Sequence, residues 1–390
     1  MNKKFMNYPL TSDSWGEKEI KALNEVVKSR QFTMSKKVRK FEEEFAKFFN
    51  CKDSVMVNSG SSANLLMFSL LKNKYKLKGD VIVPAVGWST SYFPINQNGF
   101  KLNFVDVDLD TLNIDPEKIE RAITSKTCAI LAINLLGNSC DFIRLKRIAK
   151  KYKIILLEDN CESFGAKTEE NFFTGTQSLL GTFSFFYSHH LQTMEGGMIL
   201  SNNINDVHYL RSLRAHGWIR DLPDNNKIYS KTGNDFYDSF TFVTPGYCLR
   251  PLEISGAVGS VQLKRSSFFL EQRRKNASFF VEKFKHLETV QIQKEIGKSS
   301  WFGFSILLKN SLKNKRHLVI ERLKKNGIQT RPIVTGNFLR NPVMKYLDYI
   351  DNKDYNSSEY IHKNGFFIGN NHKDLKKEIN LVYNIIKKIS

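Results

Sequence analysis

The sequence lacks long apolar runs and clustered cysteines, and each absence excludes a class of protein. No stretch of the 390 residues reaches the roughly 18 apolar positions that a membrane-spanning helix needs. The basic N-terminus is not followed by an apolar segment, so it does not match a signal peptide, and we expect a cytoplasmic protein without a membrane partner. The cysteines are too scattered for a CxxC metal motif, and their odd number argues against a disulfide framework: Cys51, Cys128, Cys140, Cys161 and Cys248.

Motifs for nucleic-acid binding are also missing, although the formal net charge is +20. The lysines are spread along the chain and often lie at helical spacing from glutamates, as in residues 36–49 (KKVRKFEEEFAKFF). There is no Arg-rich arm, zinc finger or stripe of aromatic and basic residues. We therefore interpret the charge as a compositional bias and expect no nucleic-acid partner. A positive field would still attract an anionic small substrate such as a nucleotide.

The order of apolar and amphipathic segments predicts a large α/β domain over residues 1–250. Two segments with helical periodicity, 17–30 and 36–49, come first. Short apolar runs then alternate with helical patterns, and the runs that read as strands are 54–57, 80–83, 102–107, 129–134 and 154–157. Because these runs are mainly apolar and 154–157 (IILL) is wholly so, we expect a mostly parallel sheet that is covered by helices on both faces.

The pattern changes in the last part of the chain, which predicts a smaller domain over residues 251–390. A long helical stretch covers 252–286, and a strand-like run follows at 300–308. Two further helices are expected at 316–326 and 378–388. These segments predict a long connecting helix and a small α+β domain, and 390 residues are enough for two hydrophobic cores.

Small or polar residues follow several strands, at the edge where open α/β sheets bind ligands. Asn58–Ser62 (NSGSS) opens a helix whose N–H groups and hydroxyls can bind an anion, although serine caps are common. Trp88 follows the next strand, and it either stacks on a planar ligand or packs into the core. Glu158 and Asp159 end a buried strand, where carboxylates are costly unless they pair with a cationic group.

Two adjacent histidines, His189 and His190, mark a fourth strand end within the segment 183–197 (FSFFYSHHLQTMEGG). Neighbouring side chains on an extended segment point apart and no other ligands converge, so we expect no metal site here. One cofactor would use all four strand ends. Pyridoxal phosphate needs an anion cradle, an aromatic face, a carboxylate at its pyridine nitrogen and a catalytic base beside its C4′ carbon.

The motifs occur in an order that resembles one known family over essentially the whole chain. They are NSGSSANLL, VPAVGWST, LLEDNCES, GTFSFFYSHH, RAHGW and PGYCLRPLE, and they resemble the DegT/DnrJ/EryC1/StrS family. The resemblance implies the fold-type-I (aspartate aminotransferase-like) architecture, with pyridoxal 5'-phosphate as cofactor and a nucleotide-linked 4-keto sugar as substrate. It also implies a homodimer with active sites at the subunit interface.

His189 stands where the aminotransferases of this family carry the lysine that binds the cofactor covalently. No lysine occurs between Thr168 and Asn226. A histidine at this position resembles the sugar 3-dehydratase branch of the family, in which pyridoxal and pyridoxamine phosphate are held noncovalently. The branch implies that L-glutamate donates an amino group and that C3 of GDP-4-keto-6-deoxy-D-mannose is then deoxygenated. The other products would be 2-oxoglutarate and ammonia, and the sugar would serve a colitose-type surface polysaccharide.

The resemblance also implies roles for single residues at the cofactor. His189 would move a proton at the cofactor's C4′, Asp159 would pair with the ring nitrogen, and Glu162 would face the ring's 3-hydroxyl. The resemblance assigns the phosphate to Gly60, Ser61 and Ser184, and the ring face to Trp88. Relatives commonly carry asparagine where this chain has Cys248, and that asparagine reaches the phosphate bound to the neighbouring subunit. A thiol is a poor hydrogen-bond donor, so this contact is in doubt.

The family resemblance also implies substrate contacts, through a less direct match, for four residues: Phe240, His216, Arg250 and Arg331. Phe240 would come from the partner subunit, and Arg331 would meet the diphosphate or lie at the surface. His190 is interpreted as structural. Four alternatives stay open: the same chemistry on a GDP-4-keto heptose, a nucleotide-sugar aminotransferase that uses another lysine, a noncatalytic binding protein, and an iron–sulfur CDP-sugar 3-dehydratase. The last of these needs a cysteine cluster that the chain lacks.

Overall fold

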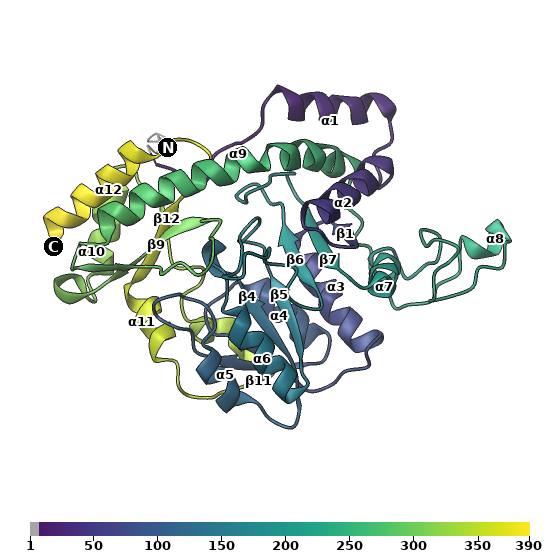
Figure 1. The fold of residues 1–390 in the computed structure, drawn as a ribbon, viewed down its shortest axis with the longest axis horizontal. Helices are drawn as coiled ribbons and strands as arrows, with labels where there is room; N and C mark the ends of the chain where they lie inside the picture. The colour runs from purple at the N-terminus through teal and green to yellow at the C-terminus, as the bar shows by residue number, and fades with distance from the viewer. Residues whose placement is uncertain (1–7) are drawn as a thin grey trace.

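Residues 8–390 of the computed structural model form two β-sheets connected by a long helix (Figure 1). The eight strands of the first sheet are β1 (Asp53–Val57), β2 (Asp80–Pro84), β3 (Lys101–Val105), β4 (Thr127–Ile133), β5 (Ile155–Asp159), β6 (Gly181–Ser184), β7 (Gly197–Ser201) and β11 (Tyr349–Ile350). The four strands of the second sheet are β8 (Val290–Ile292), β9 (Gly303–Leu308), β10 (Thr330–Arg331) and β12 (Gly365–Gly369).

The first sheet has the order β1-β7-β6-β5-β4-β2-β3-β11, and most of its neighbours are parallel. Only β7 runs antiparallel, to β1 on one side and to β6 on the other. The predicted mostly parallel sheet is therefore confirmed. Its parallel strands all end at one edge, which brings the loops after β2, β5 and β6 together.

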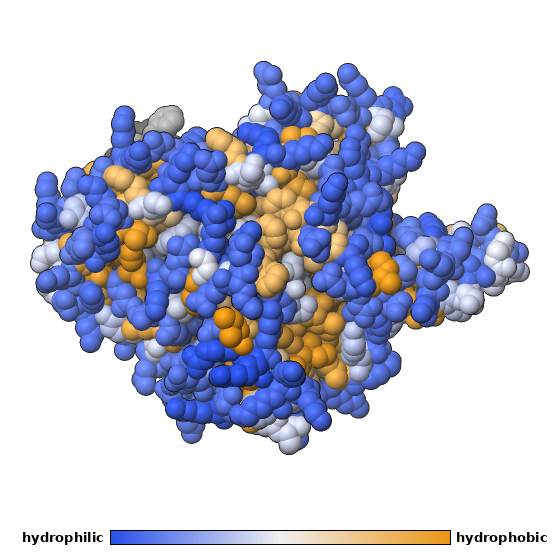
Figure 2. Space-filling model, in the orientation of Figure 1, coloured by the Kyte–Doolittle hydropathy of each residue, from blue (hydrophilic) through white to orange (hydrophobic). Residues whose placement is uncertain are grey.

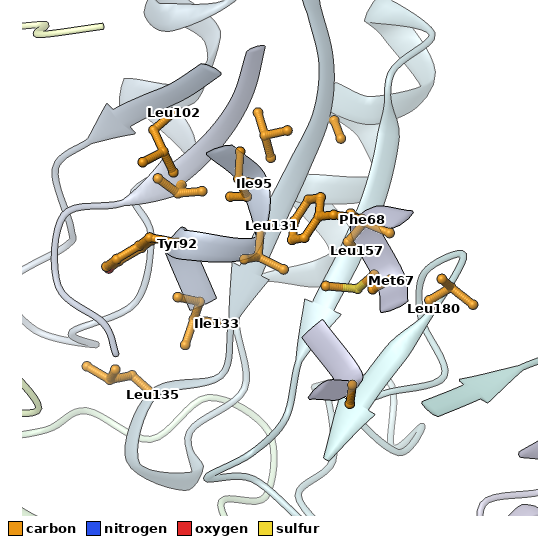
Figure 3. Close-up of a cluster of buried hydrophobic side chains, with 14 of the residues drawn as sticks. Met67, Phe68, Tyr92, Ile95, Leu102, Leu131, Ile133, Leu135, Leu157 and Leu180 are labelled. Carbon is orange, nitrogen blue, oxygen red and sulfur yellow. The ribbon is translucent and has the colours of Figure 1, made fainter. Parts of the chain in front are cut away.

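Helices cover both faces of this sheet, because alternate strand residues point to opposite sides. Val81 and Val83 of β2 pack with one buried cluster, while Ile82 between them belongs to another. The first cluster includes side chains of α3 (Gly60–Asn73), α4 (Ser89–Gln97) and α7 (Ile204–Arg214), and Figure 3 shows part of it. The second cluster includes side chains of α5 (Pro116–Ala122) and α6 (Phe142–Tyr152).

Helix α9 (Glu253–Phe284) runs from the first sheet to the second (Figure 1). It packs against α1 (Glu17–Ser29) and α2 (Lys36–Phe48) near its start and against α12 (Lys376–Ile389) near its end. The second sheet, with the order β10-β12-β9-β8, shares a core with α10 (Arg316–Lys325) and α12. A further helix, α11 (Asn356–Asn364), lies before β12.

The division into domains at residue 250 stays a prediction. The edge strand β11 comes from the later part of the chain, yet it pairs with β3 in the first sheet, with Tyr349 opposite Leu102. The arm, residues 216–250, contains the short helix α8 (Asp235–Asp238) and projects from the body of the protein (Figure 1). Hydrophilic residues cover most of the face seen in Figure 2, and apolar residues gather near its middle. None of the helices within residues 8–390 is both long enough and apolar enough to cross a membrane.

Candidate active site

A cavity of about 340 Å³ lies at the carboxyl ends of β5 and β6, against the start of α3. It collects side chains from both parts of the chain, since β10 and β12 contribute as well as the first sheet. The predicted site residues that line it are Gly60, Ser61, Trp88, Asp159, Glu162, Ser184, His189 and Arg331. All four strand ends singled out in the sequence therefore meet in one cavity.

The start of α3 faces this cavity and lies very close to β6. A Cβ atom on Gly60 would lie 2.6 Å from Cβ of Ser184 and 2.9 Å from Sγ of Cys161, so only glycine fits. Ser59 caps the helix by accepting a hydrogen bond from the N–H of Ser62 at 3.1 Å. Free N–H groups at the first turn, together with the hydroxyls of Ser61 and Ser184, provide a site for an anion.

Asp159 ends β5 and is only 3% exposed, yet no basic side chain within residues 8–390 forms an ion pair with it. Its Oδ2 accepts hydrogen bonds from Nδ2 of Asn64 at 2.8 Å and from Oγ of Ser91 at 2.7 Å. Its Oδ1 accepts one from the N–H of Cys161 at 3.0 Å. These bonds fix a carboxylate at the cavity wall that lacks a cationic partner from its own chain. A protonated pyridine nitrogen would supply that partner.

The two other carboxylates near this strand differ in their surroundings. Glu158 points to the opposite face of β5 and accepts bonds from the N–H groups of Gly175 and Gln177, so it ties a loop and does not line the cavity. Glu162 does line the cavity, and its Oε2 accepts a hydrogen bond from the N–H of Leu136 at 2.9 Å. Burial raises the pKa of Glu162 to about 7, so it can hold or release a proton near neutral pH.

His189 lies in the turn after β6, between two aromatic rings. Its ring centroid is 6.1 Å from that of Phe186 and 5.3 Å from that of Phe302. Oγ of Ser188 lies 3.4 Å from Nδ1 of His189. Burial, assisted by the positive charge of Arg273, lowers the pKa of His189 to about 4. The imidazole is therefore neutral at pH 7 and able to accept a proton.

His190 points away from the cavity and is 3% exposed. Its Nε2 lies 3.1 Å from the backbone oxygen of Ser300 and donates to it, because a carbonyl can only accept. Nδ1 is buried and has no hydrogen-bond partner in the described part of the chain. The two histidines thus face different surroundings, although the segment is a turn, with the N–H of His189 bonded to the carbonyl of Phe186, and not the extended segment that was expected.

Trp88 and Arg331 are at the open side of the cavity. Trp88 precedes α4, and its side chain is 55% exposed, so it is not part of the core. Arg331 ends β10 and is exposed. An exposed indole and an exposed guanidinium at one cavity mouth suit a ligand with a planar ring and a negatively charged group.

The remaining predicted residues lie in the arm and do not line the cavity of their own chain: His216, Phe240, Cys248 and Arg250. Phe240 is 67% exposed, and the ring of His216 packs on that of Trp218 at 5.1 Å. Nη2 of Arg250 lies 3.7 Å from Sγ of Cys248, and its guanidinium lies over the ring of Trp218.

Several residues that build the cavity were not predicted. Asn64 holds Asp159, and its position four residues after Gly60 puts it on the same face of α3, a signal that the sequence does contain. Ser91 and Glu195 also contribute, the first by a bond to Asp159 and the second as part of the lining. Phe302 and Phe367 come from the second sheet, and no local pattern links them to the strand ends.

The residues of the cavity fit pyridoxal phosphate. The N-terminus of α3 with Ser61 and Ser184 can hold the phosphate, and Asp159 can hold the protonated ring nitrogen. Trp88 can cover the ring, and Glu162 can meet its hydroxyl. Within the described residues, no lysine lines the cavity, so the group would be held without a covalent bond to the chain.

Comparison with known proteins agrees with this set of residues. The sequence profile of the DegT/DnrJ/EryC1/StrS aminotransferase family matches residues 13–387. The GDP-4-keto-6-deoxy-D-mannose 3-dehydratase of Yersinia pseudotuberculosis is 49% identical over 394 residues, which cover 100% of both chains. The Escherichia coli GDP-4-keto-6-deoxy-D-mannose-3-dehydratase with bound hydrated PLP has a TM-score of 0.95 at 48% identity, covering 98% of this chain and 99% of that one.

A second solved structure is described as GDP-4-keto-6-deoxymannose-3-dehydratase with a trapped PLP-glutamate geminal diamine. It has a TM-score of 0.94 at 48% identity, and the match covers 97% of this chain and 100% of that chain. Both the family match and the relatives extend over nearly the whole sequence. The chain belongs to the DegT/DnrJ/EryC1/StrS aminotransferase family.

Proposed function

We propose that the protein is a pyridoxal-phosphate-dependent 3-dehydratase of GDP-4-keto-6-deoxy-D-mannose that uses L-glutamate as amino donor. The observation that carries the proposal is His189, which lines the cavity at a position where no lysine is available. A histidine cannot replace a primary amine in a covalent bond to the cofactor, but it can transfer protons. The relatives at 48 and 49% identity bear the name of this activity.

The cofactor, when bound in its pyridoxamine form, supplies an amine for the sugar's C4 ketone and an electron sink that allows the C3 hydroxyl to leave. Asp159 keeps the ring nitrogen protonated, because its carboxylate is fixed by Asn64 and Ser91 and has no other cationic partner among residues 8–390. Ser61, Ser184 and the start of α3 bind the phosphate. Glu162 faces the 3-hydroxyl, and its pKa of about 7 lets it share that proton.

His189 accepts the proton that leaves the cofactor's C4′ carbon. Its lowered pKa keeps the imidazole neutral, and the tautomer in which Nδ1 donates to Oγ of Ser188 leaves Nε2 free to receive the proton. The rings of Phe186 and Phe302 restrict the orientation of the imidazole.

The substrate side of the site is completed by a second copy of the chain. In one chain, Phe240 and Arg250 lie on the projecting arm and leave the cavity open. A partner's arm would add an aromatic ring and a cation beside Trp88 and Arg331, which suits a GDP-linked sugar. We further propose a cytoplasmic enzyme that supplies a colitose-type 3,6-dideoxy sugar for a surface polysaccharide.

A spectroscopic experiment tests the proposal. The protein loaded with pyridoxal phosphate should show no protein adduct after borohydride reduction, and L-glutamate should convert the cofactor to its pyridoxamine form. Addition of GDP-4-keto-6-deoxy-D-mannose should then release ammonia. An aminated sugar in place of ammonia would identify an aminotransferase. Turnover of the GDP-4-keto heptose in preference to the hexose would change the substrate but keep the chemistry.

A further inference from the structure

The segment 299–302 forms the wall behind the two histidines. The ring of Phe302 lines the cavity, with its centroid 5.3 Å from that of His189 and an interplanar angle of 64°. The same ring lies 5.8 Å from His190, whose Nε2 donates to the carbonyl of Ser300 at 3.1 Å. The position of this segment therefore decides how the imidazole of His189 is held.

Arg273 of α9 forms hydrogen bonds to backbone carbonyls of this segment. Its Nη1 donates to the carbonyl oxygens of Trp301 at 3.3 Å, Phe302 at 3.2 Å and Asn370 at 2.7 Å. The side chain is 5% exposed, and no carboxylate within residues 8–390 forms an ion pair with it. Burial lowers its pKa to about 9, so the guanidinium stays charged at neutral pH. A buried cation without a carboxylate partner is costly for the fold alone.

The backbone of the segment is also strained, at Trp301. Trp301 has a φ of 49°, a left-handed conformation that non-glycine residues rarely adopt. Its carbonyl receives a second bond, from Nδ2 of Asn370 at 2.9 Å. Such a conformation persists only where the surroundings enforce it. The bonds from Arg273 and Asn370 enforce it here, immediately before Phe302.

We propose that Arg273 is a positioning residue that holds Phe302 against His189 through the carbonyls of Trp301 and Phe302. The proposal rests on the proposed 3-dehydratase function, since it concerns the residue that receives the proton. Arg273 lies behind this segment and does not line the cavity. It acts by fixing the imidazole in the one orientation that faces the cofactor's C4′ carbon.

The charge of Arg273 has a second effect, on the protonation of His189. It opposes a positive charge on the imidazole and so adds to burial in lowering the pKa. His190 adjoins His189 in the chain, and the other ionisable groups that line the cavity are Asp159, Cys161, Glu162, Glu195 and Arg331. A neutral base works above its pKa, and the rate falls as the pH drops through that value. Removal of the Arg273 charge therefore moves the acid limb of the pH profile upward.

Three variants separate these effects. Arg273→Met removes the bonds and the charge, and we expect kcat to fall at least about tenfold at nearly unchanged KM, with the acid limb raised by about one pH unit. Arg273→Lys keeps the positive charge but loses the planar set of guanidinium N–H donors. We therefore expect kcat to fall, while the acid limb of the pH profile stays in place. Phe302→Leu removes the ring contact alone and lowers kcat without a shift of the acid limb. If Arg273→Met does not fold, Arg273→Lys and Phe302→Leu still test the positioning role.

Arg274→Met is the matched control. Arg274 also donates to carbonyls around this segment, of Ser299 at 3.0 Å and Gly165 at 2.8 Å, but it does not contact Trp301 or Phe302. We expect its kcat to change less than about threefold and its acid limb to stay in place. A loss in Arg274→Met as large as in Arg273→Met would show that the segment needs only general support, and it would overturn the proposal.

A titration without turnover provides an independent readout. In protein labelled with ¹³C-histidine, the His189 signal can be assigned by its absence in His189→Asn, and its pKa should rise in Arg273→Met but not in Arg273→Lys. Wild-type kcat in Arg273→Lys and Phe302→Leu would overturn the positioning role, and an unmoved His189 signal in Arg273→Met would overturn the charge effect. Failure of the proposed function looks different, because the wild-type protein itself would then release no ammonia.

Discussion

The predicted site residues lie in two regions of the molecule, the cavity and the arm, and these regions hold their side chains in different ways. In the cavity, Asp159 is 3% exposed and has three hydrogen-bond donors, so its position is fixed by its own chain. On the arm, Phe240 is 67% exposed and Phe236 is 77% exposed, and neither faces the cavity. One chain thus brings together the residues that fit the cofactor, while the predicted residues of its arm stay outside its own cavity. In the proposed dimer, a partner's arm would complete the substrate side.

The largest expected effect comes from His189→Lys at the centre of the cavity. A lysine can bond covalently to the cofactor and favours amine transfer, so ammonia release should fall by about 100-fold or more. A borohydride-reducible protein adduct should appear at the same time. Ammonia release at the wild-type rate would contradict the role of His189. His317→Lys serves as the control, since His317 is exposed and does not line the cavity.

Asp159→Asn should have the next largest effect, because it removes the charge that pairs with the ring nitrogen. We expect kcat to fall by about 100-fold at most and the cofactor to dissociate more readily, as for a buried charge left unpaired. Bonds to Asn64 and Ser91 can be partly retained, so the fold should survive. Absorbance during dialysis measures cofactor loss, and Glu158→Gln is a comparison in which the carboxylate faces away from the cavity. Equal cofactor retention in Asp159→Asn and the wild type would argue against the pairing.

Complementation between subunits tests the arm directly. The double variant Phe240→Ala/Arg250→Ala should lose about tenfold in kcat/KM for the nucleotide sugar but keep the glutamate half-reaction, because its own cavity is intact. His189→Asn should be inactive for the opposite reason. A mixture of the two should recover up to about a quarter of wild-type activity, since half of the dimers are hybrids with one complete site. No recovery in verified hybrid dimers would show that each chain uses its own arm.

The parts of this molecule that depend on local sequence were predictable. The parallel sheet follows from mainly apolar runs such as 80–83 and 154–157, which correspond to β2 and β5. The cavity follows from a general rule, since ligands bind at the carboxyl ends of parallel strands, and Gly60, Asp159 and His189 all lie there. The roles of these residues at the cofactor stay a prediction, which rests on their chemistry and on the family resemblance.

Contacts between distant segments could not be predicted in the same way. Arg273 and Phe302 come together only because α9 packs along the second sheet, and neither residue lies in a motif. The pairing of Tyr349 with Leu102 in β11 involves two residues and has no periodic signal. Burial also shifted His189 from its ordinary pKa near 6.5 to about 4, a change that depends on neighbours from three separate elements.

The smallest expected effect is a gain, from Cys248→Asn on the arm. Cys248 is exposed in one chain, and its thiol is a poor donor to a phosphate that a second subunit would bind. An asparagine amide would add one hydrogen bond across the interface, so the dissociation constant for pyridoxal phosphate should fall about three- to tenfold. Cys51→Asn, at a thiol outside residues 216–250, controls for removal of a thiol. If Cys248→Asn binds the cofactor no more tightly than the wild type, the arm of one subunit does not reach the phosphate of the other, and its contribution is confined to the sugar nucleotide.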